Sequence, residues 1–271
     1  MPRTTSPSAS KSRKARRRGP LATISLLAVG LLFTGGAYAA FSTSTASAEV
    51  PAVVSAASVE EGEKLFAANC ASCHGLALEG TENAPSLIGV GAAAVDFQVG
   101  TGRMPMQAHG PQAPDKPVQF TDEQILSMAQ YVASIAPGPA IPDESLLDGE
   151  GDVANGAELF RINCAMCHNV AGAGGALTEG KWAPSLSGVE PAHIYEAMVT
   201  GPQNMPVFND ANLTPEDKRD VISALKFMEE NPSPGGNQLG SLGPVAEGLF
   251  LWIFGLGTIV AITVWITARS N

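Results

Sequence analysis

Two five-residue segments constrain this chain more than any other feature: Cys70-Ala71-Ser72-Cys73-His74 and Cys164-Ala165-Met166-Cys167-His168. In one helical turn the two cysteines stand three residues apart and the histidine follows at the fourth, so the three side chains share one face. C-x-x-C-H is the attachment sequence of c-type haem. The sequence therefore predicts two covalently bound haem c groups, one held by Cys70, Cys73 and His74 and one by Cys164, Cys167 and His168.

Zinc sites and redox dithiols also use C-x-x-C. The histidine that follows both motifs favours haem, and the two motifs use all 4 cysteines of the chain. Aromatic residues make up only 6% of the sequence, while it holds 29 glycines and 20 prolines. This composition predicts small, loop-rich domains with little apolar core of their own. A covalently held haem would complete such a core, as metals do in other small scaffolds.

The sequence around the motifs is repeated. Four features recur at matching positions: a glycine eight residues before the first cysteine, a Leu-Phe pair, a Pro-Ser-Leu segment and a Met-Pro pair. They are Gly62 and Gly156, Leu65-Phe66 and Leu159-Phe160, Pro85-Ser86-Leu87 and Pro184-Ser185-Leu186, and Met104-Pro105 and Met205-Pro206. Such a repeat predicts two copies of one domain. We place the first repeat at residues 59–136 and the second at 153–230.

Each repeat is predicted to be helical at both ends, which makes the fold class all-α. Val59–Ala68 leads into the first haem motif, and the closing helices are expected at Thr121–Ile135 and Thr214–Met228. Thr121 suits an N-cap, and Leu126, Ala129 and Tyr131 suit an apolar stripe. Residues 42–58, 137–152 and 231–247 are rich in Ser, Pro, Gly or acidic residues and predict a tether and two linkers.

Both ends of the chain carry apolar segments. Residues 1–41 form a basic leader with an uncharged run, Leu21–Phe41, that suits either a signal peptide cleaved before Ala40 or an uncleaved anchor. Residues 248–268 are long enough to cross a membrane, with Trp252 and Trp265 near the ends and Arg269 after them. We expect a plasma-membrane protein with extracytoplasmic haem domains and a cytoplasmic C-terminus.

The charge of the chain is strongly asymmetric. Seven of the 16 basic residues and no acidic residue lie in residues 1–41, which leaves nine basic against 26 acidic residues, a net charge of -17, in the rest. Nucleic-acid binding requires a basic surface. The acidic body therefore argues against a nucleic-acid partner.

The sixth ligand of each iron decides between electron transfer and the binding of small molecules. Met104 and Met205 each precede a proline at comparable distances after the haem motif, and this matched pair predicts axial ligation together with His74 and His168. Met106 is the rival of Met104. Met166 is expected to pack, and His109 and His193 (the latter on a surface helix) to be solvated or hydrogen-bonded rather than to bind iron. His–Met ligation predicts relatively high reduction potentials.

Each repeat resembles a class I cytochrome c domain: an N-terminal helix, C-x-x-C-H, a Met–Pro loop and a C-terminal helix. Two such domains followed by one membrane helix resemble the dihaem cytochrome c subunit of the actinobacterial quinol–cytochrome c reductase, the bcc-type complex. The resemblance implies cytochrome b and Rieske iron–sulfur subunits as partners, and a haem-copper cytochrome c oxidase as electron acceptor. It also implies ligand sets of Cys70, Cys73, His74 and Met104, and of Cys164, Cys167, His168 and Met205.

Two other functions are open at this point. One is a dihaem electron-transfer subunit of a different membrane or periplasmic oxidoreductase. The other is a dihaem peroxidase or sensor, which requires an iron with an open sixth position. The Pro-rich segment Ala108–Gln119 occurs only in the first repeat and suits either a partner contact or a cover for the haem edge.

Overall fold

The computed structural model describes residues 24–25, 27–34, 56–231, 239 and 244–269. The chain divides into two units, Met1–Val50 and Pro51–Asn271. In the first unit, residues 24–25 and 27–34 are helical with exposed side chains. The predicted cleavage point before Ala40 and the predicted tether from residue 42 to 55 lie outside the described residues.

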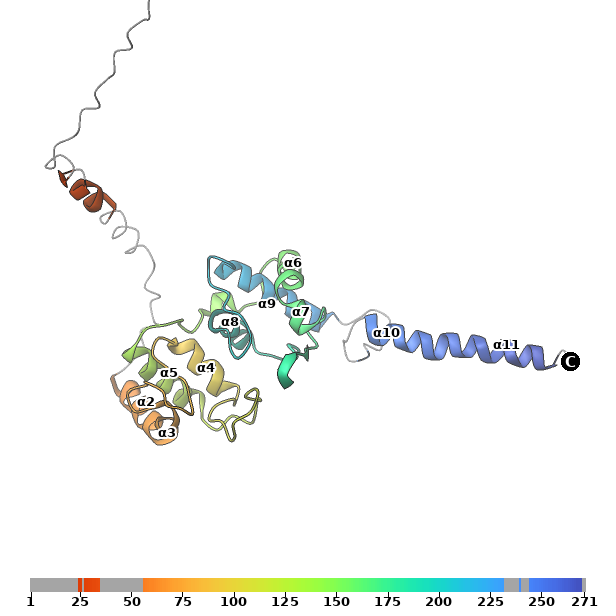
Figure 1. Ribbon diagram of the computed structural model, residues 1–271, viewed down its shortest axis with the longest axis horizontal. Helices are drawn as coiled ribbons and strands as arrows, with labels where there is room; N and C mark the ends of the chain where they lie inside the picture. The colour runs from red at the N-terminus through yellow and green to blue at the C-terminus, as the bar shows by residue number, and fades with distance from the viewer. Residues whose placement is uncertain (1–23, 26, 35–55, 232–238, 240–243, 270–271) are drawn as a thin grey trace, which may run out of the picture. The chain divides into compact units, whose positions relative to one another are not determined.

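The first repeat contains four helices: α2 (Ala56–Asn69), α3 (Ala71–His74), α4 (Gly91–Gly100) and α5 (Asp122–Ile135). A short 3₁₀ helix, η1 (Glu144–Leu146), lies in the predicted linker. The second repeat contains α6 (Val153–Asn163), α7 (Ala165–His168), α8 (Pro191–Thr200) and α9 (Pro215–Glu230). Helix follows helix in the same order in both repeats (Figure 1), so the prediction of an all-α fold is confirmed.

Strands are confined to the second repeat within the described residues. β1 (Gly175–Ala176) and β2 (Trp182–Ala183) pair antiparallel, with Gly175 opposite Ala183 and Ala176 opposite Trp182. The 3₁₀ turn η2 (Thr178–Gly180) connects them. The hairpin lies between the second C-x-x-C-H motif and Pro184, and so adds a projection to the loop that follows the motif.

The first and last long helices of each repeat approach each other most closely at the same position in both repeats. A Cβ atom placed on Gly62 of α2 would lie 2.0 Å from the Ser127 carbonyl oxygen of α5. One placed on Gly156 of α6 would lie 1.9 Å from the Asp220 carbonyl oxygen of α9. Only glycine permits so close an approach of two backbones. The repeated glycine recognised in the sequence is thus a contact point of the two helices.

The closing helices begin as the sequence predicts. Thr121 and Thr214 each accept a hydrogen bond from the backbone N–H three residues later, and the side chains of Gln124 and Asp217 accept one in return from the N-cap backbone. The predicted stripe on α5 was partly wrong. Leu126 is 44% exposed, whereas Ile125, Met128 and Val132 are buried with Ala129 and Tyr131.

The C-terminal apolar segment is helical from Pro244 to Arg269, as α10 (Pro244–Phe250), the π-helical stretch η4 (Leu251–Leu256) and α11 (Gly257–Arg269). Among the described residues it is the one helix long and apolar enough to cross a membrane, and no residue of its most apolar part is buried. Its 25 residues from Val245 to Arg269 span about 37 Å, more than one hydrocarbon thickness. This helix suits a membrane anchor.

Candidate functional site

Each C-x-x-C-H motif forms one helical turn set off from the helix before it. The Cys70 carbonyl accepts hydrogen bonds from the N–H groups of Cys73 (3.0 Å) and His74 (2.9 Å). The Cys164 carbonyl accepts the same two bonds, from Cys167 (3.1 Å) and His168 (2.9 Å). Two cysteines and a histidine therefore stand on one short turn in both repeats.

The histidine that ends each turn is oriented by a backbone carbonyl. Nδ1 of His74 lies 2.8 Å from the carbonyl oxygen of Pro85, and Nδ1 of His168 lies 2.9 Å from that of Pro184. A carbonyl can only accept, so each Nδ1 carries the proton and donates it. Nε2 is then left with a free lone pair, which is the form of histidine that binds a metal.

The loop that supplies this carbonyl is held in the same way in both repeats. The Leu87 N–H donates to the Leu78 carbonyl, and the Leu186 N–H donates to the Gly172 carbonyl, both at 2.8 Å. Ser86 Oγ donates to Leu78 as well. The repeated Pro-Ser-Leu segment therefore fixes the acceptor of the histidine.

Both predicted methionines join the apolar cluster that contains the first cysteine of the motif. Met104 and Cys70 pack against the cluster of Val99, Ile125 and Met128. Met205 packs against the cluster that includes Cys164, Phe160 and Leu225. The Met104 backbone N–H donates to Gln98 and that of Met205 to Pro202. Each repeat thus brings two thiols, an imidazole and a thioether to one region.

A cavity of about 390 Å³ opens at the second site. Cys164, Cys167, His168 and Met205 line it, together with apolar side chains such as Phe160 and Leu225. Its size is that of a pocket for a small ligand. An apolar cavity lined by these four groups fits a flat, largely apolar macrocycle whose edge would bond to two thiols and whose metal would be held by an imidazole and a thioether.

The first repeat contributes to the walls of this cavity. Arg103 and Gln112 line it although they belong to the first repeat. Gln112 is held there by two hydrogen bonds of 2.9 Å with the Trp182 backbone, one donated by Nε2 and one accepted by Oε1. The Pro-rich segment 108–119 therefore contacts the second repeat of its own chain.

Burial favours the protonated form of the first thiol in each motif. Burial, with a smaller contribution from the neighbouring cysteine, raises the pKa of Cys70 and of Cys164 to about 11. The thiolate is the form that binds zinc and attacks disulfides, and a raised pKa disfavours it. Burial also lowers the pKa of His168, despite its bond to Pro184, which keeps the imidazole neutral.

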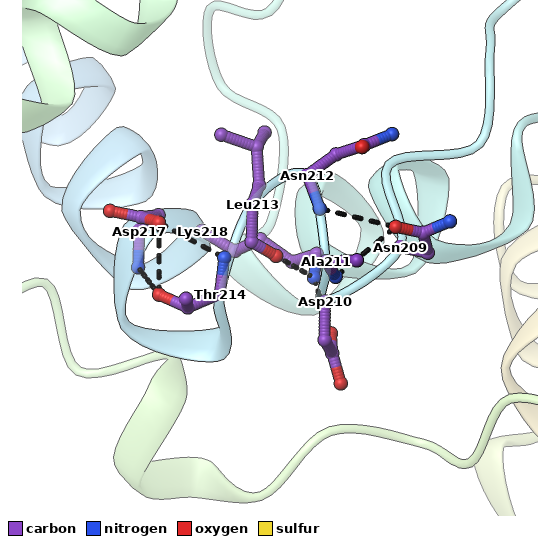
Figure 2. Close-up of polar contacts among 8 residues, drawn as sticks. All are labelled: Asn209, Asp210, Ala211, Asn212, Leu213, Thr214, Asp217 and Lys218. Atoms are coloured by element: carbon purple, nitrogen blue, oxygen red, sulfur yellow. Dashed lines mark hydrogen bonds and ion pairs between the residues drawn. The ribbon is translucent and has the colours of Figure 1, made fainter. Parts of the chain in front are cut away.

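The loop after Met205 is tied to α9 by a buried lysine (Figure 2). Lys218 is fully buried, and its Nζ donates to Asp210 Oδ1 and to the Leu213 carbonyl, both at 2.7 Å. Asn209 Oδ1 accepts from the N–H groups of Ala211 and Asn212, each at 3.1 Å, which closes the turn. These contacts hold the loop that follows Met205 against α9, the last helix of the second repeat.

The sequence also assigns surroundings to four residues outside the two ligand sets. His109 is exposed, as expected. Met166 is 92% exposed, so the expectation that it packs was wrong. His193 does not lie on a surface helix, because α8 packs against α4 of the first repeat and the His193 ring meets Phe97 edge-on. Met106, the rival of Met104, is 38% exposed and belongs to neither apolar cluster described above.

Comparison with known proteins identifies the class of both repeats. Residues 59–136 match the family described as "Cytochrome c", and residues 151–223 match "Cytochrome C oxidase, cbb3-type, subunit III". Together with the helical repeats, these matches define a protein with two cytochrome c domains, the class of domain that carries covalent haem c.

Several curated relatives share one name. A "Cytochrome bc1 complex cytochrome c subunit" of Corynebacterium efficiens is 46% identical over 228 residues, covering 78% of this chain and 77% of the relative. The protein of the same name in Mycobacterium tuberculosis H37Rv is 43% identical over 270 residues, covering 96% of each chain. The chain belongs to this family of cytochrome bc1 complex cytochrome c subunits.

A more distant relative is similar to about a third of this chain. "Cbb3-type cytochrome c oxidase subunit FixP" of Sinorhizobium medicae is 32% identical over 95 residues, which is 30% of this chain and 32% of the relative.

Proposed function

We propose that this chain is the membrane-anchored, dihaem electron-transfer subunit of a quinol–cytochrome c reductase. In this proposal it receives electrons from the Rieske iron–sulfur protein and passes them to a haem-copper cytochrome c oxidase, beside a cytochrome b subunit. The observation that carries the proposal is the matched pair of sites, each with a histidine Nδ1 held by a proline carbonyl. Membership of the bc1 cytochrome c subunit family supports the choice of complex.

The eight ligand residues follow from the two sites. Cys70, Cys73, His74 and Met104 would hold the first haem, and Cys164, Cys167, His168 and Met205 the second. A bound haem supplies an iron that gains and loses one electron. The protein residues would bind and orient it: the thiols would fix its edge, the histidine would offer Nε2, and the methionine would supply a second ligand to the iron.

The contact between the repeats supports electron exchange within one chain. Arg103 directly precedes Met104 in the first repeat, and its side chain lines the cavity of the second site. The two sites are therefore linked by adjacent residues rather than by a long connection. Tethered carriers keep donor and acceptor at high effective concentration, so the relay requires no diffusing carrier.

The apolar helix at the C-terminus supports anchoring in the plasma membrane. We propose that Arg269 lies on the cytoplasmic side and that both haem domains lie outside, in keeping with the positive-inside rule for flanking residues. The basic leader, with its seven positive charges in residues 1–41, supports the same orientation.

A second candidate is a dihaem subunit that serves another oxidoreductase. The match of residues 151–223 to a cbb3-type oxidase subunit favours it to the extent that such a domain also serves in an oxidase. A dihaem peroxidase or sensor is a weaker candidate, because both repeats place a methionine in the cluster of the first cysteine.

Purification through a tag on this chain tests the proposal. After mild detergent solubilisation, we expect haem c together with b-type haem, a Rieske protein and an a-type oxidase, identified by spectra and mass spectrometry. Untagged membranes carried through the same steps are the control. Recovery of haem c alone, or with a soluble dehydrogenase, would contradict the assignment to this complex while keeping the two-haem carrier.

A further inference from the structure

The contact between the two repeats contains a group of potential metal ligands outside the two predicted haem ligand sets, although one of them, His193, also lines the cavity of the second site. Helix α4 of the first repeat packs against α8 of the second. In this contact Asp96, His193 and Glu196 bring their ligand atoms within 4.8 Å of one another. Asp96 comes from α4, whereas His193 and Glu196 stand three residues apart on α8 and so share a face.

Glu196 is the unusual member of this group. Its side chain is 0% exposed, and neither carboxylate oxygen has a hydrogen-bond partner among the described residues. None of the ion pairs found in the described part of the chain includes it. A buried ionised carboxylate without a donor or a cation is strongly disfavoured. Either a proton or a cation must therefore neutralise Glu196.

A proton compensates only part of the site. Burial, the negative charge of Asp96 and, in the protonated form, a hydrogen bond with Asp96 raise the pKa of Glu196 to about 10. A proton on Glu196 satisfies the two carboxyl groups only, whereas a ligand atom of His193 lies within 4.8 Å of theirs as well. A dication accepts lone pairs from all three groups and balances both carboxylate charges.

We propose that Asp96, His193 and Glu196 bind one Zn²⁺ ion that joins the two haem domains. One imidazole nitrogen and two carboxylate oxygens form a donor set that zinc accepts, with a fourth position for water. Zinc–ligand distances of about 2.0–2.2 Å place tetrahedral ligands roughly 3.3–3.6 Å apart. Movements of the ligand atoms by roughly 1 Å, through side-chain rotation, would therefore close the site around the ion.

The surroundings already orient the imidazole. The His193 ring meets Phe97 at a centroid distance of 6.1 Å and an interplanar angle of 84°. A Cβ on Gly100 would lie 2.9 Å from His193 Nε2, so the ring rests against the α4 backbone where that helix has no side chain. Because its ligands come from both repeats, the ion would cross-link α4 to α8 beside the two haem sites.

The test is zinc binding by the full, haem-loaded chain. The protein is purified in detergent through a tag without histidine, and only preparations with two irons per chain are used, so that no motif cysteine is free. After treatment with EDTA it is titrated with Zn²⁺ by calorimetry. We expect one tightly bound zinc per chain, with a nitrogen/oxygen shell and no sulfur at the zinc absorption edge.

Matched variants separate this site from other metal binding. Asp96→Asn, Glu196→Gln and His193→Ala should each weaken zinc binding roughly 100-fold or more. Loss of a residue that only supports a ligand already costs about 10- to 100-fold in metal affinity, and loss of a ligand itself should cost at least as much. His109→Ala, an exposed histidine of the first repeat, should bind zinc like the wild type. Unchanged haem spectra report that the variants fold.

Three outcomes would overturn the proposal: no zinc retained by the haem-loaded wild type, unchanged affinity in the three ligand variants, or sulfur in the zinc shell. The first would leave a carboxylate pair that shares a proton. None of these outcomes bears on the haem ligands or on the complex to which the chain belongs.

Discussion

At the residue scale, the two sites depend on one backbone carbonyl each. The repeated Pro-Ser-Leu segments in the sequence mark this carbonyl, but the sequence alone does not indicate that it accepts from histidine Nδ1. The residue that receives the segment's backbone hydrogen bond has a left-handed conformation in both repeats, with φ of 64° at Leu78 and 68° at Gly172. Glycine adopts this conformation freely, whereas Leu78 is held in it by complete burial.

The methionine assignments can be tested one by one. Met104→Ala and Met205→Ala should each lower the reduction potential of one haem by on the order of 100 mV, because loss of the thioether removes the ligand that favours ferrous iron. Each variant should also let carbon monoxide bind the reduced protein. Potentiometry and visible spectra provide the measurement. Met106→Ala is the control, and a larger effect of this variant than of Met104→Ala would reassign the ligand.

The buried lysine behind Met205 should matter for both stability and ligation. Lys218→Ala removes two hydrogen bonds and leaves the Leu213 carbonyl unpaired. We expect a loss of about 2–3 kcal/mol in the unfolding free energy of the second domain, since a charged donor is lost from a buried site. Urea unfolding followed through the haem spectrum measures it. Lys64→Ala, at an exposed ion pair, should leave the transition unchanged; equal effects of the two variants would contradict the role given to Lys218.

At the element scale, the sequence predicted the parts that repeat and missed those that do not. The glycines at the helix crossings, the N-caps Thr121 and Thr214 and the helices leading into the motifs follow from local pattern and propensity. Leu126 and His193 were assigned to the wrong surroundings. Leu126 is one position after Ile125 and therefore points about 100° away from it around the helix, out of the buried face. The surroundings of His193 depend on a helix of the other repeat.

The helix crossings predict a cost for the smallest possible side chain. Gly156→Ala places a Cβ where the Asp220 carbonyl oxygen now lies, and Gly62→Ala does the same against Ser127. Overpacking costs about 1–3 kcal/mol and more when backbone must move, which exceeds the gain of about 1 kcal/mol in helix propensity. Thermal unfolding should therefore show a lower midpoint for both variants. The exposed Glu158→Ala on α6 is the control; a glycine variant as stable as this one would contradict the close crossing.

At the scale of the whole molecule, the contact between the repeats is the feature that sequence could not supply. It combines the α4–α8 packing with the two hydrogen bonds from Gln112 to the Trp182 backbone. Neither has a local signature, because a glutamine in a Pro-rich segment and a helix face with His193 and Glu196 both read as solvent-exposed. The Pro-rich segment is thus an internal contact, and through Gln112 it joins the wall of the second haem site.

The anchor can be tested by truncation. A chain that ends at Asn231, with residues 1–41 replaced by a cleavable signal peptide, should be exported, load haem and appear in the soluble extracytoplasmic fraction, because α10, η4 and α11 are removed. The same leader on the chain extended to residue 271 is the control and should fractionate with the membrane. A truncated chain that stays in the membrane in the absence of its partner subunits would show that another segment anchors it.

The central claim is that both repeats hold a covalent haem. Intact-mass and peptide mass spectrometry of the purified chain tests it most directly, because thioether bonds survive denaturation. The account predicts two haem additions, one on the peptide with Cys70 and Cys73 and one on the peptide with Cys164 and Cys167. A single addition, or a disulfide or zinc at either motif in place of haem, would contradict it.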